Sequence, residues 1–317
     1  MRTRSSTRGR YRSRLGAAAL GVLLGFTAAS AATPVRAFSV FACEPEWAAL
    51  VRVLMPDARV YKATHARQDP HHIEARPALI AQLRDADLAV CTGAALEAGW
   101  LPMLQQRAGN PRVQDGAAGM FYAADHVSLL DPHVGGITPF DGDVHPDGNP
   151  HLQTDPRRLL DAARSLSAQL QRLVPTQAVQ IDERYRQFEA RWKERIRDWE
   201  RRAGPLRGRA VAAQHATFAY LWNWLGITQS VDLEPKPGMA PTPGHLQRVI
   251  DTLRAKPPLA VVAATYQDPR PARWIAGQLD GVLLLELPAT VTDDTAVDAL
   301  EGWFEQLLQA LTKAAAR

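Results

Sequence analysis

Short apolar runs alternate with helical apolar patterns through the first part of the chain. The runs have the length and composition of buried strands and cover residues 38–43, 58–61 and 86–91, with a shorter extended edge at 127–130. Other segments carry apolar side chains three or four positions apart, the period of a helix: residues 44–54, a stretch opened by Pro77, and residues 93–107. Strands that alternate with helices predict a mostly parallel sheet with helices on both faces.

The same alternation returns in the last third of the chain. The predicted strands are residues 210–213, 228–233, 259–263 and 282–287. The predicted helices are residues 218–225, 245–255, 271–279 and 296–314. This part of the chain therefore predicts a second α/β unit.

Two helical patterns lie between these units. Asp155 caps and Pro156 opens a helix that runs to about Leu173. The longest pattern follows Pro175 and ends near Gly204. Its apolar residues are spaced 4, 3, 4, 4 and 3 positions apart: Ile181, Tyr185, Phe188, Trp192, Ile196 and Trp199. We expect this stripe to be core packing and the helix to be a stiff connection between the units.

These patterns predict an α/β fold of two lobes with mostly parallel sheets, joined by one long rigid helix. A chain of 317 residues, of which 46% are hydrophobic, is long enough for two domains. The expected divisions are a signal peptide (1–37), an N-terminal lobe (38–174), a connecting helix (175–204) and a C-terminal lobe (205–317).

The first residues have the layout of a secretory signal peptide. Residues 1–14 contain six arginines and no acid, and residues 15–26 form an apolar run that is short for a bilayer span. Small residues at 35–37 predict a mature chain that starts at Phe38, with cleavage nearer Ala32 and an uncleaved membrane anchor as alternatives. We expect a periplasmic protein.

The net charge changes sign when the leader is set aside. The formal charge of the whole chain is +4, and it becomes −2 without the six leader arginines. The composition therefore gives no reason to expect a nucleic-acid partner, and we expect a monomer.

The chain has two cysteines, Cys43 and Cys91, and each lies at the end of a predicted strand. If the two strands are neighbours in a parallel sheet, the thiols lie close enough to form a disulfide, which persists after export. Residues 40–43 also resemble a lipid-attachment box faintly. Because Cys43 lies well past the apolar run, we favour the disulfide.

Three histidines lie in turns that are marked by proline or follow a predicted strand: His71, His151 and His215. Neutral imidazole is a good ligand for Zn²⁺ and its first-row neighbours. The separations of 80 and 64 residues match no local zinc motif. The ends of strands are nevertheless where α/β sheets gather ligands, so we hypothesise that these histidines converge on one metal ion.

The segments around these histidines resemble a known family. Residues 69–74 (Asp-Pro-His-x-Ile-Glu), 149–156 (Asn-Pro-His and then Asp-Pro) and 215–220 (His-Ala-Thr-Phe-Ala-Tyr) look like the three histidine motifs of periplasmic zinc and manganese substrate-binding proteins of ABC transporters. This is the cluster A-I family, also called ZnuA/TroA-like. Residues 86–97 resemble the same family's first-lobe strand and the helix after it, and the match covers essentially the whole mature chain.

The resemblance implies a binding protein rather than an enzyme. It implies that His71 and His151 are ligands from the first lobe and His215 from the second, with the metal in the cleft between the lobes. The transported ligand would be Zn²⁺, with Mn²⁺ as the alternative, and the partner would be the membrane permease of an ABC transporter. His72 is the rival of His71, but the family motif places the ligand directly after the Asp-Pro pair.

The fourth ligand stays open at this point. Family members often take a carboxylate from the last strand-to-helix loop, where this chain offers Glu286, Asp293 and Asp294, and water is a further candidate. Three imidazoles with water or one carboxylate suit tetrahedral Zn²⁺, whereas a second oxygen donor would favour Mn²⁺. We favour zinc.

Two other functions use the same features. A secreted zinc-dependent hydrolase would need the same three histidines and a general base, for which Glu74 is a candidate. Some relatives of the family are surface adhesins, so cell adhesion is a further hypothesis. The loop 131–149 contains aspartates and two histidines, His133 and His145, and could either capture a cation transiently or be a solvated excursion.

Overall fold

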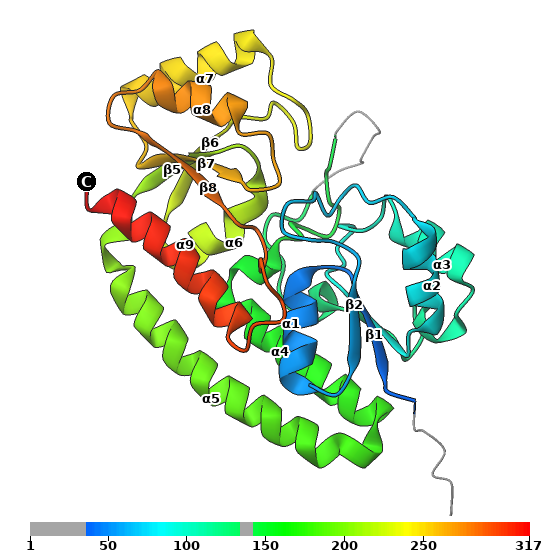
Figure 1. Cartoon of the computed structure of the whole chain (residues 1–317). Helices are drawn as coiled ribbons and strands as arrows, with labels where there is room; N and C mark the ends of the chain where they lie inside the picture. Colours follow the sequence, from blue (N-terminus) through cyan, green and yellow to red (C-terminus); the bar gives the residue numbers. More distant parts are fainter. Residues whose placement is uncertain (1–35, 134–141) are drawn as a thin grey trace, which may run out of the picture. The chain divides into compact units, whose positions relative to one another are not determined.

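The computed structural model describes residues 36–133 and 142–317 (Figure 1). Residues 37–317 form one compact unit. The predicted signal peptide lies almost entirely outside the described residues, as does the middle of the loop 131–149. Within the described part of the chain, no helix has both the length and the apolar character needed to cross a membrane.

The first sheet has four parallel strands in the order β2-β1-β3-β4. Its strands are β1 (Ser39–Ala42), β2 (Arg59–Lys62), β3 (Leu88–Cys91) and β4 (Met120–Tyr122). Its helices are α1 (Pro45–Leu54), α2 (Pro77–Asp85) and α3 (Leu101–Ala108). We call this sheet with its three helices the N-terminal lobe.

The second sheet repeats this arrangement in the order β6-β5-β7-β8, again all parallel. Its strands are β5 (Ala210–Ala213), β6 (Thr228–Asp232), β7 (Ala260–Ala264) and β8 (Leu283–Leu287). Its helices are α6 (Ala219–Leu225), α7 (Pro243–Ala255) and α8 (Arg270–Gly277). We call this sheet with these helices the C-terminal lobe.

In both sheets the chain starts at an inner strand and then winds outward in both directions. The connections that follow the two inner strands leave the sheet on opposite sides: α1 and α6 pack in one core cluster, whereas α3 and α8 pack in two others. A crevice therefore forms beyond the carboxyl ends of the two inner strands. The crevice lies beyond β1 and β3 in the N-terminal lobe, and beyond β5 and β7 in the C-terminal lobe. These are the places where such sheets hold ligands.

Three long helices pack together outside the sheets: α4 (Pro156–Leu173), α5 (Ala178–Arg202) and α9 (Ala299–Ala315). Helix α5 contacts α4, α1 and α9, and Figure 1 shows α5 and α9 running side by side. All six residues of its predicted apolar stripe are buried in one core cluster that also contains residues of both sheets. The α/β fold with a long connecting helix is therefore confirmed.

Two predicted elements were wrong. Residues 93–107 do not form one helix: Gly93, Ala94 and Ala95 have φ of 81°, 49° and 62°, and the helix begins only at Leu101. Left-handed backbone cannot continue a right-handed helix. Residues 127–130 form no strand; β4, which the pattern missed, is the fourth strand of the first sheet.

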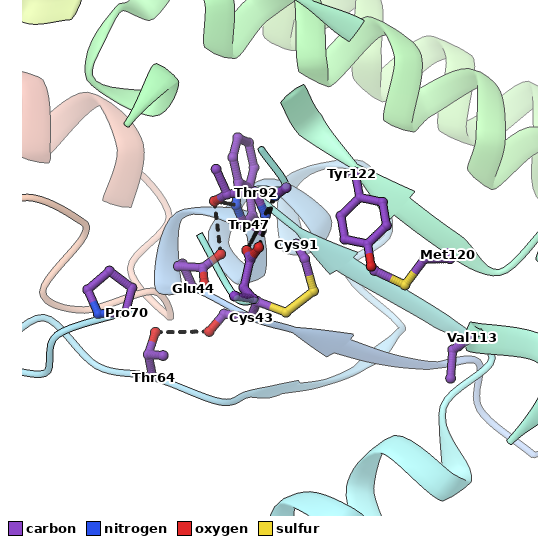
Figure 2. Close-up of a disulfide and its surroundings, with 12 residues drawn as sticks. Cys43, Glu44, Trp47, Thr64, Pro70, Cys91, Thr92, Val113, Met120 and Tyr122 are labelled. Atoms are coloured by element: carbon purple, nitrogen blue, oxygen red, sulfur yellow. Dashed lines mark hydrogen bonds between the residues drawn. A yellow bond between two sulfur atoms is a disulfide. The ribbon is translucent and has the colours of Figure 1, made fainter. Parts of the chain in front are cut away.

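The two cysteines form a disulfide, as expected (Figure 2). Strands β1 and β3 are neighbours, and the Cα atoms of Cys43 and Cys91 lie 4.8 Å apart just at the ends of these strands. The sulfur of Cys43 is therefore bonded, which argues against the lipid-attachment alternative. The backbone after β1 is also fixed by Thr64, whose hydroxyl donates to the carbonyl of Cys43 over 2.9 Å.

Candidate metal centre

The three predicted histidines come from three separate turns. His71 lies between β2 and α2, His151 lies shortly before α4, and His215 follows β5 directly. All three side chains are buried, with 6%, 2% and 9% of their surface exposed, respectively. Buried imidazoles at strand ends are the arrangement that the sequence analysis expected of ligands.

The structure brings these three rings together. One ring nitrogen from each histidine lies within 4.8 Å of the other two. The ring centroids are 5.3 Å apart for His71 and His151, 5.9 Å for His71 and His215, and 5.6 Å for His151 and His215. The Nε2 atoms of His71 and His151 are buried and have no hydrogen-bond partner. Buried polar atoms normally have a partner, so these lone pairs are available to a cation.

Asp69 orients the ring of His71. Its carboxylate accepts from the Nδ1–H of His71 over 2.7 Å and from the backbone N–H of His71 over 3.0 Å. Burial of Asp69 acts to raise its pKa, but the hydrogen bond and charge of His71 outweigh burial and the pKa is lowered. A carboxylate on Nδ1 fixes the tautomer that leaves Nε2 free for a metal.

Glu234 plays the same part for His215. Its carboxylate lies 2.8 Å from Nδ1 of His215 and also accepts from the backbone N–H of Gly238 over 2.8 Å. Burial acts to lower the pKa of His215, yet the hydrogen bond and the charge of Glu234 together raise it. No pattern in the sequence singled out Glu234, although its position just after β6, the neighbour of β5, was a usable signal.

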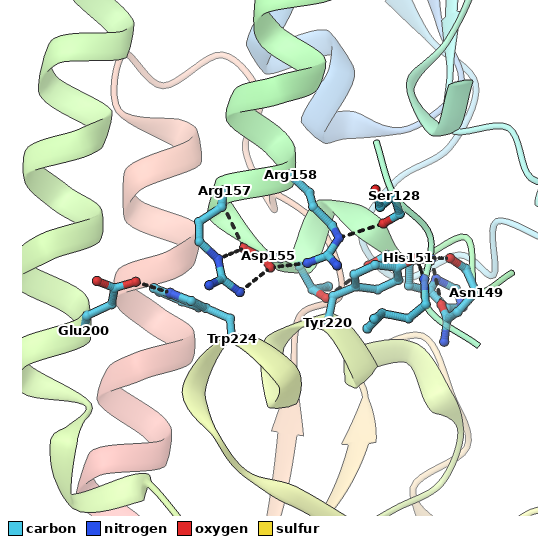
Figure 3. A network of polar contacts seen from close by, with 11 residues as sticks. Ser128, Asn149, His151, Asp155, Arg157, Arg158, Glu200, Tyr220 and Trp224 are labelled. Carbon is cyan, nitrogen blue, oxygen red and sulfur yellow. Dashed lines mark hydrogen bonds and ion pairs between the residues drawn. The ribbon is translucent and has the colours of Figure 1, made fainter. Parts of the chain in front are cut away.

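His151 is held through its backbone (Figure 3). Its N–H donates to the side chain of Asn149 over 2.9 Å, and the amide of Asn149 donates to the carbonyl of Ala216 over 3.0 Å. Tyr220 donates to the carbonyl of Asn149 over 2.6 Å and accepts from the N–H of Leu130 over 2.9 Å. Since Tyr220 belongs to α6, a helix of the C-terminal lobe fixes a turn that carries a histidine of the first half.

The surroundings keep the ring of His151 neutral. Its pKa is lowered well below the ordinary value by burial and by the neighbouring imidazoles of His71, His215 and His145. Only the neutral ring has a lone pair to offer a metal. His151 is therefore ready to bind without first losing a proton.

A fourth histidine, His145, lies close to the three rings. Its ring centroid lies 5.3 Å from that of His71, and both of its ring nitrogens are buried without a partner. Burial and the neighbouring imidazoles of His71 and His215 lower its pKa to about 4. It is not one of the three residues whose nitrogens meet within 4.8 Å, but it lines a cavity together with His151 and His215. In the sequence it is one of the two histidines of the loop 131–149, which we expected either to capture a cation transiently or to be a solvated excursion.

His72 lies outside this cluster. Its side chain is 70% exposed and its Nε2 is 3.9 Å from a carboxylate oxygen of Asp143. This agrees with the preference for His71 over its neighbour.

The carboxylates suggested as fourth ligands have other partners. Glu286 pairs with Arg273 over 3.0 Å, and Asp293 accepts from the hydroxyl and N–H of Thr295. Asp294 is bound by Arg52 and Lys62. None of the three lines the cavities that the histidines line. Of the described side chains, His145 is the better candidate to approach the centre.

The chain is similar to known proteins in sequence and in fold. The chain matches the family model for ZnuA, the periplasmic component A of a zinc-uptake complex, over residues 40–314. No curated protein sequence matches the chain.

Several solved structures have the same fold. A zinc-bound ZnuA deletion mutant is 20% identical, with a TM-score of 0.71, and the match covers 86% of this chain and 98% of that one. FpvC from Pseudomonas aeruginosa, a substrate-binding protein solved with Mn²⁺, is 20% identical, with a TM-score of 0.71 and coverage of 89% and 99%. A mutant of the laminin-binding adhesin Lmb from Streptococcus agalactiae is 22% identical, with a TM-score of 0.68 and coverage of 86% and 99%. Because the family model spans most of the chain, this protein belongs to the ZnuA family of periplasmic metal-binding proteins.

Proposed function

We propose that this protein captures a divalent transition metal in the periplasm and delivers it to the permease of an ABC transporter. His71, His151 and His215 are the ligands of the transported ion, and binding and release are the activity. Zinc is the cargo that we favour and manganese is the alternative.

The convergence of three buried imidazoles carries this proposal. Two of their Nε2 atoms are buried with no partner, and two of the rings have a carboxylate on Nδ1. Structural histidines in a core are normally hydrogen-bonded at their buried nitrogens. A carboxylate behind the ring is the usual arrangement at metal-binding histidines, because it orients the ring and raises its basicity.

The donor set favours zinc over manganese. The nearest side chains to the three ligands include a fourth imidazole, His145, and the carboxylates Asp69 and Glu234 are already bonded to ring nitrogens. Manganese prefers a larger share of oxygen donors, whereas zinc accepts nitrogen ligands in tetrahedral geometry. The solved relatives with zinc and with Mn²⁺ support both metals as candidates.

Competition with a chromophoric chelator tests the ligand assignment. We expect the mature chain to bind one equivalent of zinc more tightly than manganese, and we expect His71→Ala, His151→Ala and His215→Ala each to bind zinc at least about 100-fold more weakly, since each loses a metal–nitrogen bond. His72→Ala is the matched control because His72 is the neighbouring histidine and is 70% exposed. Equal losses in His71→Ala and His72→Ala would argue against the assignment.

Delivery to a permease needs its own experiment. Membrane vesicles that contain the permease and ATPase of the cognate transporter should take up zinc only when the mature, zinc-loaded chain is added. Vesicles that take up zinc equally well with His215→Ala would show that the three-histidine site is not the source of the transported ion.

The hydrolase hypothesis has less support. Glu74, the general base suggested for it, is exposed and lines none of the cavities formed by the histidines. Two carboxylates near the histidines, Asp69 and Glu234, already accept hydrogen bonds from the rings of His71 and His215. The ZnuA family consists of solute-binding components, so our proposal contains no catalytic step.

A further inference from the structure

A small second cavity lies behind the three-histidine centre. Its volume is about 20 Å³. This is enough for a single water-sized species, since one water needs roughly 10–15 Å³. Residues of both lobes line it, among them Glu44, Glu46, Gln68, Gln153, Tyr266 and Thr290. The ZnuA assignment gives this cavity no role.

The cavity is lined by oxygen atoms without partners. Oε1 of Glu44, of Glu46 and of Gln153 are each buried with no hydrogen bond, and so is Oε1 of Gln68. The first three side chains are 3%, 0% and 4% exposed. The orientation of the Gln153 amide is fixed, because its nitrogen donates to the carbonyl of Ala289 over 3.4 Å. An oxygen acceptor is therefore the group that it leaves free.

The other carboxylate oxygens are held by donors from several elements (Figure 2). Oε2 of Glu44 accepts from the hydroxyl of Thr92 over 3.0 Å, and that hydroxyl accepts from the indole of Trp47 over 2.9 Å. Oε2 of Glu46 accepts from the hydroxyl of Thr290, in the loop after β8. The two carboxylates are thus fixed by one oxygen each, and the second oxygen of each is left for another species.

Three buried acidic side chains gather at this cavity. A third buried carboxylate, Glu97, accepts from the backbone N–H of Thr92 over 2.7 Å. Among the residues that the structure describes, no lysine or arginine lines the cavity, and its basic groups are the imidazoles of His65 and His151. Burial, with repulsion from Glu97 and Glu46, raises the pKa of Glu44 well above its ordinary range. Burial raises the pKa of Glu46 to about 7. Ionised carboxylates at this depth need a positive partner.

Protons satisfy part of this set. Glu44 and Glu97 lie within hydrogen-bond distance of each other, so their carboxyl groups can share one proton. The buried Oε1 atoms of Glu46 and Gln153 still have no hydrogen-bond donor, and a cation in the cavity would satisfy them together with Glu44. Oxygen ligands that include two carboxylates are the donor set of hard cations such as Ca²⁺ and Mg²⁺, whereas zinc selects nitrogen and sulfur.

We propose that this cavity, which His151 also lines, binds one hard divalent cation through the free oxygens of Glu44, Glu46 and Gln153, as a second site beside the three-histidine centre. Glu44 and Glu46 lie at the start of α1, and Thr290 ties Glu46 to the loop after β8. A cation held there fastens this loop to the N-terminal lobe. The site therefore stabilises contact between the lobes without competing for the transported metal.

Calcium titration of the mature chain tests the site, because three imidazoles are a poor ligand set for Ca²⁺. We expect one equivalent of Ca²⁺ to bind by calorimetry and to raise the thermal midpoint, in chelator-stripped and in zinc-loaded protein alike. A parallel titration with Mg²⁺ shows which of the two ions the cavity prefers. Since the stripped protein is also measured, the result does not depend on whether the histidines bind zinc.

Charge-neutral variants locate the ion. Glu44→Gln and Glu46→Gln keep the shape of the side chains and should weaken Ca²⁺ binding at least about tenfold, with the zinc equivalent retained. Glu194→Gln, an exposed position on α5, should bind Ca²⁺ as the wild type does. The proposal is overturned if the wild type binds neither Ca²⁺ nor Mg²⁺, which would assign the cavity to water and protonated carboxyls. Unchanged Ca²⁺ binding in Glu46→Gln would overturn it too.

Discussion

If His215 binds a metal as we propose, Glu234 determines how protons compete with it. Its hydrogen bond and charge raise the pKa of His215 above the ordinary value, although burial acts in the opposite direction. A protonated imidazole cannot bind a metal, so affinity must fall as the pH drops through the pKa of this ring. His151 has a lowered pKa and contributes to the competition only at lower pH.

Glu234→Gln should therefore move the pH profile of zinc binding. Without the carboxylate charge, burial dominates and lowers the pKa of His215, so the loss of affinity on acidification should begin at a lower pH than in the wild type. At the highest pH of the series, where protons compete least with the metal, we expect the variant to bind about 10–100-fold more weakly, because the ring is less basic and less well oriented. Chelator competition between pH 5.5 and 8 measures both effects. Profiles of the same shape in Glu234→Gln and wild type would contradict this role.

At the level of single residues, the sequence indicates the proposed ligands more clearly than the side chains that orient or surround them. His71, His151 and His215 stand out because each lies in a turn within a recognisable motif. Glu234 and His145 do not, because their roles depend on how the turn after β6 and the loop 131–149 approach the centre. Such approaches depend on tertiary packing, which has no periodic signal in the sequence.

Among the elements, α5 illustrates what a strong pattern predicts. The indole of Trp192 is fully buried, donates to the carbonyl of Pro156 over 2.8 Å and packs against Phe188, Trp199 and Phe304. It joins α5 to the start of α4, the helix that follows His151. The amphipathic period of α5 was sufficient to predict this helix and its buried face.

Trp192→Phe should lower the free energy of unfolding by about 1–3 kcal/mol, because it leaves the carbonyl of Pro156 without its donor and opens a small cavity. Urea unfolding at neutral pH measures the change. Trp274→Phe is the matched control, since Trp274 is 43% exposed on α8, and it should change the free energy by less than about 0.5 kcal/mol. A Trp192→Phe variant as stable as this control would show that the buried indole does not anchor α5.

The two wrong predictions of secondary structure each have a local cause. The apolar spacing of residues 93–107 fits a helix, but the carboxylate of Glu97 binds the N–H groups of Thr92 and Gly93 and turns the chain before α3. Strand β4 is only three residues long, and a period of two cannot be recognised over that length.

At the scale of the whole molecule, Asp294 links the two lobes. It is 2% exposed, and its carboxylate is bound by Lys62 of β2 and by Arg52 of α1, the latter over 3.2 Å. The parallel sheets were predictable from the alternation of strands and helices. The contact between Asp294 and Arg52 joins residues 242 positions apart. It could not be predicted, because no local pattern marks such a pair.

Asp294→Asn should destabilise the protein by about 1–3 kcal/mol, the cost of leaving a buried polar group without its partner. Arg52 and Lys62 are each about one-third exposed, so water can compensate part of the loss. Denaturant unfolding measures the change. Asp298→Asn is the control because Asp298 is exposed and makes no side-chain capping bond at α9. Identical unfolding midpoints for the two variants would show that the link between the lobes contributes nothing measurable.

The central claim is that one transition metal is bound jointly by His71, His151 and His215. The most direct measurement is the bound zinc and the thermal midpoint of the mature chain as purified, after chelation and after reloading. We expect one zinc per chain and a midpoint that falls on chelation and recovers on reloading, because a ligand at 100 times its dissociation constant adds about 2.7 kcal/mol. In each of the three alanine variants, zinc should leave the midpoint unchanged. A wild-type chain that retains no zinc and shows no zinc-dependent shift would contradict the account.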